Sequence, residues 1–268
     1  MPKGISVHIG LNSVDPNQYE GWDGQLTACE ADAKDMLALA KKRKFKSSKL
    51  ILTKAATAKA VTDSILGAAK ALKPGDFFFL TYSGHGGQVK DTNGDEIDGM
   101  DETWVCYDRQ LVDDELYEMW GKFKAGVRVF VLSDSCHSGS VVRAIPAFIS
   151  GGPRVRAMPT SVVRRVQQAH AELYKKIQDE HPSAEKTKVN ANVLLISGCM
   201  DNQLSQDGDR NGLFTGTLKE VWNGGKFKSN YRRFRDIIVS KMPDDQTPNY
   251  YFVGAKNMKF EAQRPFTI

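Results

Sequence analysis

Short apolar segments alternate with longer amphipathic stretches along most of this 268-residue chain. Stretches with helical periodicity separate or follow the apolar ones: Leu26–Lys42, Thr57–Leu72, Asp113–Lys122, Ser161–Glu180 and Phe214–Trp222. Strands that alternate with helices of this length favour an α/β fold, in which helices cover both faces of a mostly parallel sheet. The apolar segments have the length and composition of buried strands: Ile5–Ile9, Leu50–Thr53, Phe77–Ser83, Val127–Ser133 and Val193–Ser197.

No internal repeat and no linker divides the chain, so we expect a single domain over residues 1–268. One long insertion, at about residues 141–190, lies between two predicted core strands. The insertion carries nine basic and four acidic side chains, which could indicate a nucleic-acid-binding domain. It lacks interleaved aromatic residues and any known binding motif, so we expect no nucleic-acid partner. Salt-sensitive retention on DNA would be the sign of that alternative.

The chain shows no sign of export or membrane insertion. No apolar run is long enough to cross a bilayer, and Met1–Gly10 is too short and too mixed for a signal peptide. The cysteines are too few and too scattered for a disulfide framework or a zinc cluster. We therefore expect a cytoplasmic protein with no membrane partner. The four cysteines are Cys29, Cys106, Cys136 and Cys199.

Two of the predicted strands end in residues that could carry out nucleophilic catalysis. His85 follows the strand Phe77–Ser83 between two glycines, and Cys136 follows the strand Val127–Ser133. A thiol attacks well only as the thiolate, which a neighbouring histidine favours by accepting its proton. If the two strands are neighbours in the sheet, both side chains emerge at its carboxyl edge, where active sites of α/β folds lie. His137 is a second candidate base, although adjacent residues of an extended segment point in opposite directions.

The segments around these two residues resemble the catalytic motifs of metacaspases, members of the caspase-like cysteine peptidases. They read Tyr-Ser-Gly-His-Gly-Gly-Gln at 82–88 and Asp-Ser-Cys-His-Ser-Gly-Ser at 134–140. The spacing of 51 residues from histidine to cysteine is that known for caspases. The resemblance implies a caspase-like three-layer α/β sandwich of the compact prokaryotic (orthocaspase) type. It also implies that Cys136 is the nucleophile, His85 the general base, and that the Gly86 and Cys136 N–H groups form the oxyanion hole.

The residues beside the catalytic pair predict a basic substrate. Asp134 lies two positions before Cys136, and its carboxylate would attract a basic side chain at the substrate position before the cut bond (P1). The resemblance assigns the P1 pocket to Cys29, Asp32, Ser83 and Asp134. Two carboxylates suit a bidentate guanidinium better than an ammonium, so we expect peptide or protein substrates with Arg preferred over Lys.

The same specificity predicts that the enzyme can cut itself, because basic residues crowd the insertion next to the catalytic cysteine. A cut there would follow one of six residues: Arg154, Arg156, Arg164, Arg165, Lys175 or Lys176.

Residues 91–118 are strongly acidic, with eleven acidic side chains against one basic. The loop 91–102 nearly fits an EF-hand, but Glu96 replaces the required glycine and no helix pair is predicted around it. The resemblance to metacaspases implies a calcium site of another kind, whose ligands in that family map onto Asp101, Asp113 and Asp114. The fourth ligand position is Arg143, which cannot bind calcium. Calcium could bind weakly through three carboxylates, or Arg143 could replace it. We favour the second reading, with no cofactor required.

An inactive caspase-like scaffold or binding domain is the alternative function, but the chain keeps both His85 and Cys136 along with the pocket carboxylates. We therefore expect an active cysteine endopeptidase. The resemblance to metacaspases further implies a monomer.

Overall fold

A six-stranded sheet forms the centre of the computed structural model, which describes residues 1–94, 96, 98–136, 154–181, 186–200 and 203–268. Its strand order is β2-β1-β3-β7-β8-β9, and every neighbouring pair is parallel except β8 with β9. The strands are β1 (Gly4–Gly10), β2 (Ser47–Leu52), β3 (Phe77–Ser83), β7 (Arg128–Asp134), β8 (Asn192–Ser197) and β9 (Asn249–Gly254).

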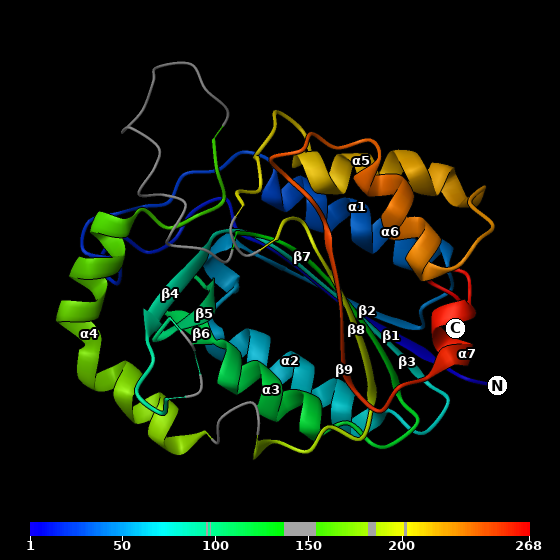
Figure 1. Cartoon of the computed structure of the whole chain (residues 1–268), viewed down its shortest axis with the longest axis horizontal. Helices are drawn as coiled ribbons and strands as arrows, with labels where there is room; N and C mark the ends of the chain where they lie inside the picture. Colours follow the sequence, from blue (N-terminus) through cyan, green and yellow to red (C-terminus); the bar gives the residue numbers. More distant parts are fainter. Residues whose placement is uncertain (95, 97, 137–153, 182–185, 201–202) are drawn as a thin grey trace.

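Helices cover both faces of this sheet, which gives the three-layer α/β arrangement predicted from the sequence (Figure 1). One layer holds α1 (Cys29–Lys42), α5 (Leu213–Trp222), α6 (Tyr231–Val239) and the short α7 (Met258–Ala262). The other holds α2 (Ala58–Ala71) and α3 (Asp113–Gly121). The apolar run in β3 is continuous because alternate side chains face opposite helix layers, and both faces of the strand are buried. Phe78 and Leu80 pack with α2 and α3, whereas Phe77 and Phe79 pack in the opposite cluster.

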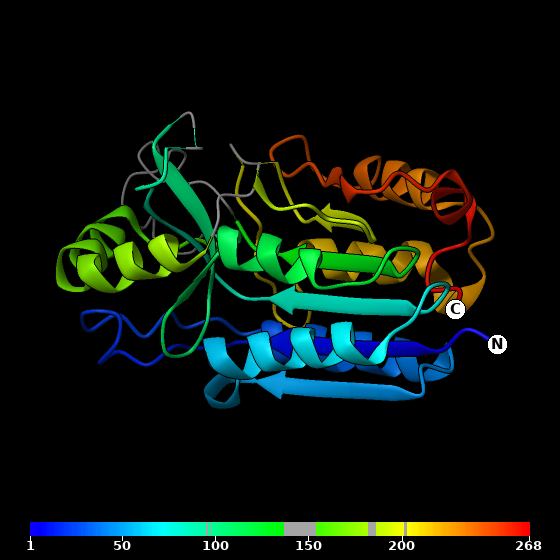
Figure 2. The same cartoon turned by 90° about the horizontal axis from the view of Figure 1, so that it is seen from below.

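A second, three-stranded antiparallel sheet stands beside the carboxyl edge of the main one (Figure 2). It consists of β4 (Gly86–Lys90), β5 (Met100–Val105) and β6 (Gln110–Val112). The long helix α4 (Thr160–Glu180) packs against β4, and Val162, Val163 and Val166 of α4 share a buried cluster with Val89 and Val105. Strands β4 and β5, not helices, flank the acidic loop 91–99, so this loop is not an EF-hand.

The structure contains all five predicted strands and all five predicted helices, with no end moved by more than three residues. The helix expected from Leu26 begins at Cys29, because the Thr27 and Ala28 N–H groups bind the carboxylate of Asp207. The remaining elements are not among those predicted, because their segments are short or mixed in character: β4, β5, β6, β9, α6 and α7. No described helix is long and apolar enough to cross a membrane.

Strands β3 and β7 are neighbours, with Ser83 directly opposite Asp134. The chain segments that follow the two strands therefore leave the sheet side by side. These are the segments that carry His85 and Cys136.

Candidate active site

His85 is held by its backbone. The Tyr82 hydroxyl donates hydrogen bonds to the carbonyl oxygens of His85 (2.7 Å) and Val105 (3.0 Å). The Tyr82 ring in turn stacks on Trp104, with ring centres 4.5 Å apart and planes only 3° from parallel. A buried aromatic pair thus fixes the position from which the histidine side chain starts.

The imidazole of His85 is oriented by a main-chain carbonyl. Its Nε2 lies 3.0 Å from the carbonyl oxygen of Gly24, which can only accept a hydrogen bond, so Nε2 carries the proton. Nδ1 then holds the free lone pair, and it has no hydrogen-bond partner among the described residues. The centre of the Trp22 ring lies 4.7 Å from the centre of the imidazole. Burial lowers the pKa of His85 to about 4. The imidazole is therefore neutral at pH 7 and able to accept a proton.

The backbones of Gly86 and Cys136 meet directly. A Cβ atom on residue 86 would lie 1.5 Å from the carbonyl oxygen of Cys136, so only glycine fits there. The N–H groups of these two residues point to one acceptor, the carbonyl oxygen of Arg156, at 2.9 Å and 3.1 Å. Two backbone donors that converge on one carbonyl oxygen have the geometry of an oxyanion hole.

The segment around Arg156 runs through this site in the manner of a bound peptide. On one side it pairs with residues 205–207: the Arg156 N–H donates to the Ser205 carbonyl at 2.9 Å, and the Asp207 N–H to the Arg154 carbonyl at 2.7 Å. On the other side the Met158 N–H donates to the Gly86 carbonyl at 2.8 Å. Strand-like pairing of this kind is a common way for proteins to hold extended peptides.

Cys136 lies under this segment and is only 1% exposed. Its Sγ accepts a hydrogen bond from the Ser205 N–H at 2.7 Å. The thiol packs in a small buried cluster with Ala157, Cys199 and Leu204, so it adjoins the residue that follows Arg156. His137 and Arg143 lie outside the described residues.

The side chain of Arg156 fills a fully buried acidic pocket. Its Nη2 lies 2.7 Å from Asp32 and 2.9 Å from Asp207, and its Nη1 lies 2.9 Å from Asp134. The Ser83 hydroxyl also accepts from Nη1, at 2.9 Å. The structure therefore brings three of the predicted pocket residues onto one guanidinium.

Neutral donors around the pocket hold its carboxylates in place. Asp134 accepts hydrogen bonds from the Ser205 hydroxyl (2.6 Å) and the Thr215 hydroxyl (2.7 Å). Asp32 accepts from the Asn211 side chain at 2.8 Å. Burial nevertheless raises the pKa of Asp32 to about 6, against the opposing charge of Arg156. The pocket therefore depends on a bound cation to keep all its carboxylates ionised near neutral pH.

Cys29, the fourth predicted pocket residue, is the first residue of α1 and is completely buried. Burial raises the pKa of its thiol to about 12, so it is a neutral part of the pocket wall.

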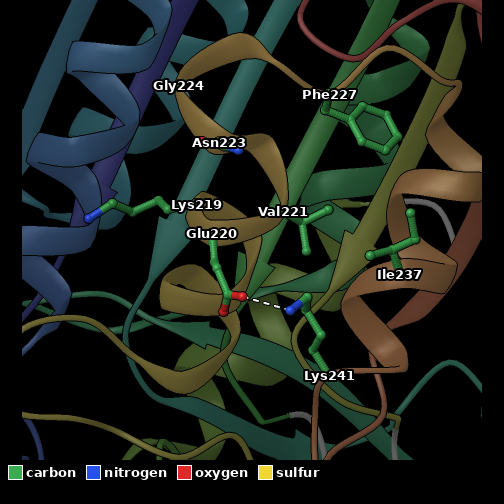
Figure 3. A pocket seen from close by; sticks show the side chains of 8 residues that line it. All are labelled: Lys219, Glu220, Val221, Asn223, Gly224, Phe227, Ile237 and Lys241. Atoms are coloured by element: carbon green, nitrogen blue, oxygen red, sulfur yellow. Dashed lines mark hydrogen bonds and ion pairs between the residues drawn. The ribbon is translucent and has the colours of Figure 1, made fainter.

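Arg156 leaves little free space in the pocket. A hollow of about 10 Å³ remains beside Asp32, Ser83 and Asp134, about the size needed for one water molecule. A larger hollow of about 600 Å³ lies elsewhere, between α5 and α6, and none of its lining residues is a predicted site residue (Figure 3).

The predicted calcium ligands are only partly brought together. Among the described residues, Asp113 groups with Glu96 and Glu102, with ligand oxygens within 4.8 Å of one another, whereas Asp101 and Asp114 are outside that group. Burial, and after it the charge of neighbouring carboxylates beginning with Glu102, raises the pKa of Asp113 to about 8. Crowded carboxylate oxygens of this kind are a donor set that fits a hard cation such as calcium.

Several residues of the site were not predicted. Gly24 and Trp22, which contact His85, and Ser205 and Asp207, which contact the bound segment, come from loops far away in sequence. The one available signal was for Asp207, because it follows a predicted core strand by ten residues, on the side of the sheet where sites gather.

The chain is similar to known proteins over most of its length. Residues 14–258 match the family model described as the caspase domain. Metacaspase-1 of Ajellomyces capsulatus is 32% identical over 244 residues, which cover 78% of this chain and 67% of that protein. Metacaspase-1 of Mycosarcoma maydis is 26% identical over 273 residues, covering 87% and 66%, and that of Schizosaccharomyces pombe is 35% identical over 175 residues, covering 54% and 41%. The chain thus spans 41% to 67% of the length of these curated relatives.

Solved structures agree on the fold. Protein GSU0716 from Geobacter sulfurreducens is 53% identical, with a TM-score of 0.91 over 99% of both chains. Caspase-1 from Spodoptera frugiperda shares the fold at 10% identity, with a TM-score of 0.52 over 94% of this chain and 86% of that one. The predicted caspase-like fold is therefore confirmed, and the chain belongs to the caspase domain family of cysteine peptidases, with metacaspases among its relatives.

Proposed function

We propose that this protein is a cysteine endopeptidase that cleaves after basic residues, with Arg preferred over Lys at P1. The observation that carries the proposal is the placement of Arg156. Its carbonyl oxygen accepts from the Gly86 and Cys136 N–H groups, while its side chain contacts three carboxylates. A residue held in both ways occupies the position that a P1 arginine takes before attack.

In the proposed reaction, Nδ1 of His85 accepts the thiol proton of Cys136, and the thiolate attacks the P1 carbonyl carbon. The Gly86 and Cys136 N–H groups hold the oxygen as it becomes negative. The histidine then gives its proton to the leaving amine, which leaves a thioester on Cys136. Water, deprotonated by the same histidine, hydrolyses the thioester and restores the thiol.

The nucleophile and the pocket can be tested together with peptides that end in Arg or Asp before a fluorogenic group, in the presence of a reductant. We expect cleavage after Arg and none after Asp, because the buried carboxylates repel an acidic side chain. Cys136→Ala should lower kcat/KM for the Arg peptide by at least about 10⁴-fold. If no peptide is cleaved even by Arg156→Ala, whose pocket its own arginine no longer fills, and Cys136 of that variant does not react with a chloromethylketone, the protein is a scaffold or binding domain instead.

The proposed oxyanion hole predicts a steep cost for a small change at Gly86. In Gly86→Ala the added Cβ meets the Cys136 carbonyl and displaces one donor, so kcat/KM should fall by about 10²- to 10³-fold or more. Gly67→Ala is the matched control, because nothing lies within 4 Å of a Cβ at that position in α2. The control should keep wild-type activity and thermal stability. Equal activity of both variants would contradict the proposed role of Gly86.

Self-processing is proposed at a single bond, Arg156–Ala157. Of the six basic residues considered, Arg156 lies in the site, whereas Arg164, Arg165, Lys175 and Lys176 are exposed positions of α4. Intact-mass analysis under reducing conditions should therefore find fragments of residues 1–156 and 157–268. Arg156→Ala should abolish them, and Arg154→Ala, at an exposed position, should not. Wild-type protein that remains one band while cleaving an Arg peptide would exclude this cut.

We propose that activity does not require calcium, because Arg143 stands at the fourth ligand position and can replace the ion. If calcium binds, then Glu96, Glu102 and Asp113 are the described residues that would hold it, and the ion would neutralise their mutual repulsion. Hydrolysis of the Arg peptide should change less than about twofold between chelator and millimolar calcium if no ion is needed. A large dependence on calcium would overturn this prediction.

A further inference from the structure

Asp207 is a third acidic residue in the pocket, and it comes from a part of the chain that neither motif predicts. Asp32 lies on α1 and Asp134 at the end of β7, whereas Asp207 lies in the loop between β8 and α5. Its Oδ1 lies 2.9 Å from Nη2 of Arg156, and the residue is only 7% exposed. It therefore contacts the bound side chain as closely as the predicted pocket residues do.

The two terminal nitrogens of Arg156 have different partners. Nη1 donates to the Ser83 hydroxyl and contacts Asp134, while Nη2 is shared by Asp32 and Asp207. Nε has no hydrogen-bond partner among the described residues. The acceptors of the pocket are thus all placed around the two ends of the guanidinium fork.

A lysine offers this arrangement only one nitrogen, which ends about one bond short of the guanidinium nitrogens. Its ammonium has three hydrogens, whereas four acceptors surround the two ends of the guanidinium: Asp32, Asp134, Asp207 and the Ser83 hydroxyl. A lysine therefore leaves one of the four without a hydrogen bond. An arginine can satisfy all four, so the contact with Asp207 adds to arginine binding without loss elsewhere.

The structure also fixes Asp207 rigidly. Its Oδ2 accepts hydrogen bonds from the N–H (2.7 Å) and the hydroxyl (2.9 Å) of Thr27, just before α1. Its own N–H donates to the Arg154 carbonyl, so the residue takes part in main-chain pairing with the bound segment as well as in contact with its side chain. A carboxylate held on both sides cannot move to follow a shorter side chain without breaking these bonds.

We propose that Asp207 is the specificity-determining residue that lets this pocket select arginine over lysine at P1. The proposal rests on the peptidase activity proposed above. It assigns to Asp32 and Asp134 the attraction of any basic residue, and to Asp207 the discrimination between the two.

The first test compares Arg and Lys peptides for wild type and Asp207→Asn, which keeps the shape of the side chain and removes its charge. Loss of a charge-assisted hydrogen bond should lower kcat/KM for Arg by about 10- to 100-fold. For Lys the loss should be no more than about threefold. The effect should be mainly in KM, because the contact exists before the chemical step. The Arg/Lys ratio is independent of the fraction of active enzyme.

Thr27→Val is the matched control, because it removes one hydrogen bond to Asp207 and leaves the contact with the substrate side chain intact. The control should keep the Arg/Lys ratio of wild type. If both variants lower Arg and Lys cleavage equally, Asp207 only supports the loop and the proposal is overturned.

A second test does not depend on activity and uses Arg156 itself as the bound residue. In the Cys136→Ala chain, which cannot cut itself, Arg156→Lys is made with Asp or with Asn at position 207. The substitution should lower the thermal midpoint more when Asp207 is present, which gives a coupling between the two sites. Zero coupling would overturn the proposal. If coupling is found but no peptide is cleaved, Asp207 still discriminates arginine from lysine, and the proposed peptidase activity is rejected.

Discussion

The parallel pairing of β3 with β7 is the constraint on which the site depends. Because Ser83 lies opposite Asp134, the chain leaves both strands at one edge, and the next residues meet backbone to backbone at Gly86 and Cys136. The contact is close enough that any side chain at position 86 would separate them. Two converging N–H groups, a buried histidine and a thiol follow from one strand register.

Buried charge is the second organising feature. Three carboxylates from α1, the end of β7 and the loop before α5 surround one guanidinium that is wholly removed from solvent. Taking such charges out of water is costly unless each oxygen has a partner. Hydroxyl and amide groups of Thr215, Ser205 and Asn211 provide those partners, so the acidic residues are already positioned by the fold. In the proposed reaction, a basic P1 side chain would meet carboxylates that these hydrogen bonds already hold.

The sequence was informative where local pattern decides structure. Apolar runs predicted the parallel strands of the main sheet, and two motifs predicted which of their ends carry His85 and Cys136. The sequence pattern does not predict β4, which begins with two glycines, or β6, which has only three residues. It does not predict β5 because that segment mixes acidic and apolar residues. Asp207 and Gly24 were not found because their roles arise from contacts between distant segments, such as Asp207 with Thr27 across 180 residues. The sequence also could not show that Arg156, and none of its basic neighbours, occupies the pocket, because that depends on the pairing of residues 154–158 with residues 205–207 and with Gly86.

The segment in the cleft is anchored independently on each side of the Arg156–Ala157 bond. Before the bond, the backbone pairs with Ser205 and Asp207; after it, Met158 bonds to Gly86 and enters the apolar cluster beneath α4. Breaking the bond removes neither anchor. A cut at this bond would leave Arg156 in the pocket until its pairing with Ser205 and its contacts with the carboxylates are broken, so cutting the bond and emptying the cleft would be separate events. In the proposed peptidase, the strength of those contacts, rather than the chemistry at Cys136, would then set how soon another peptide can enter.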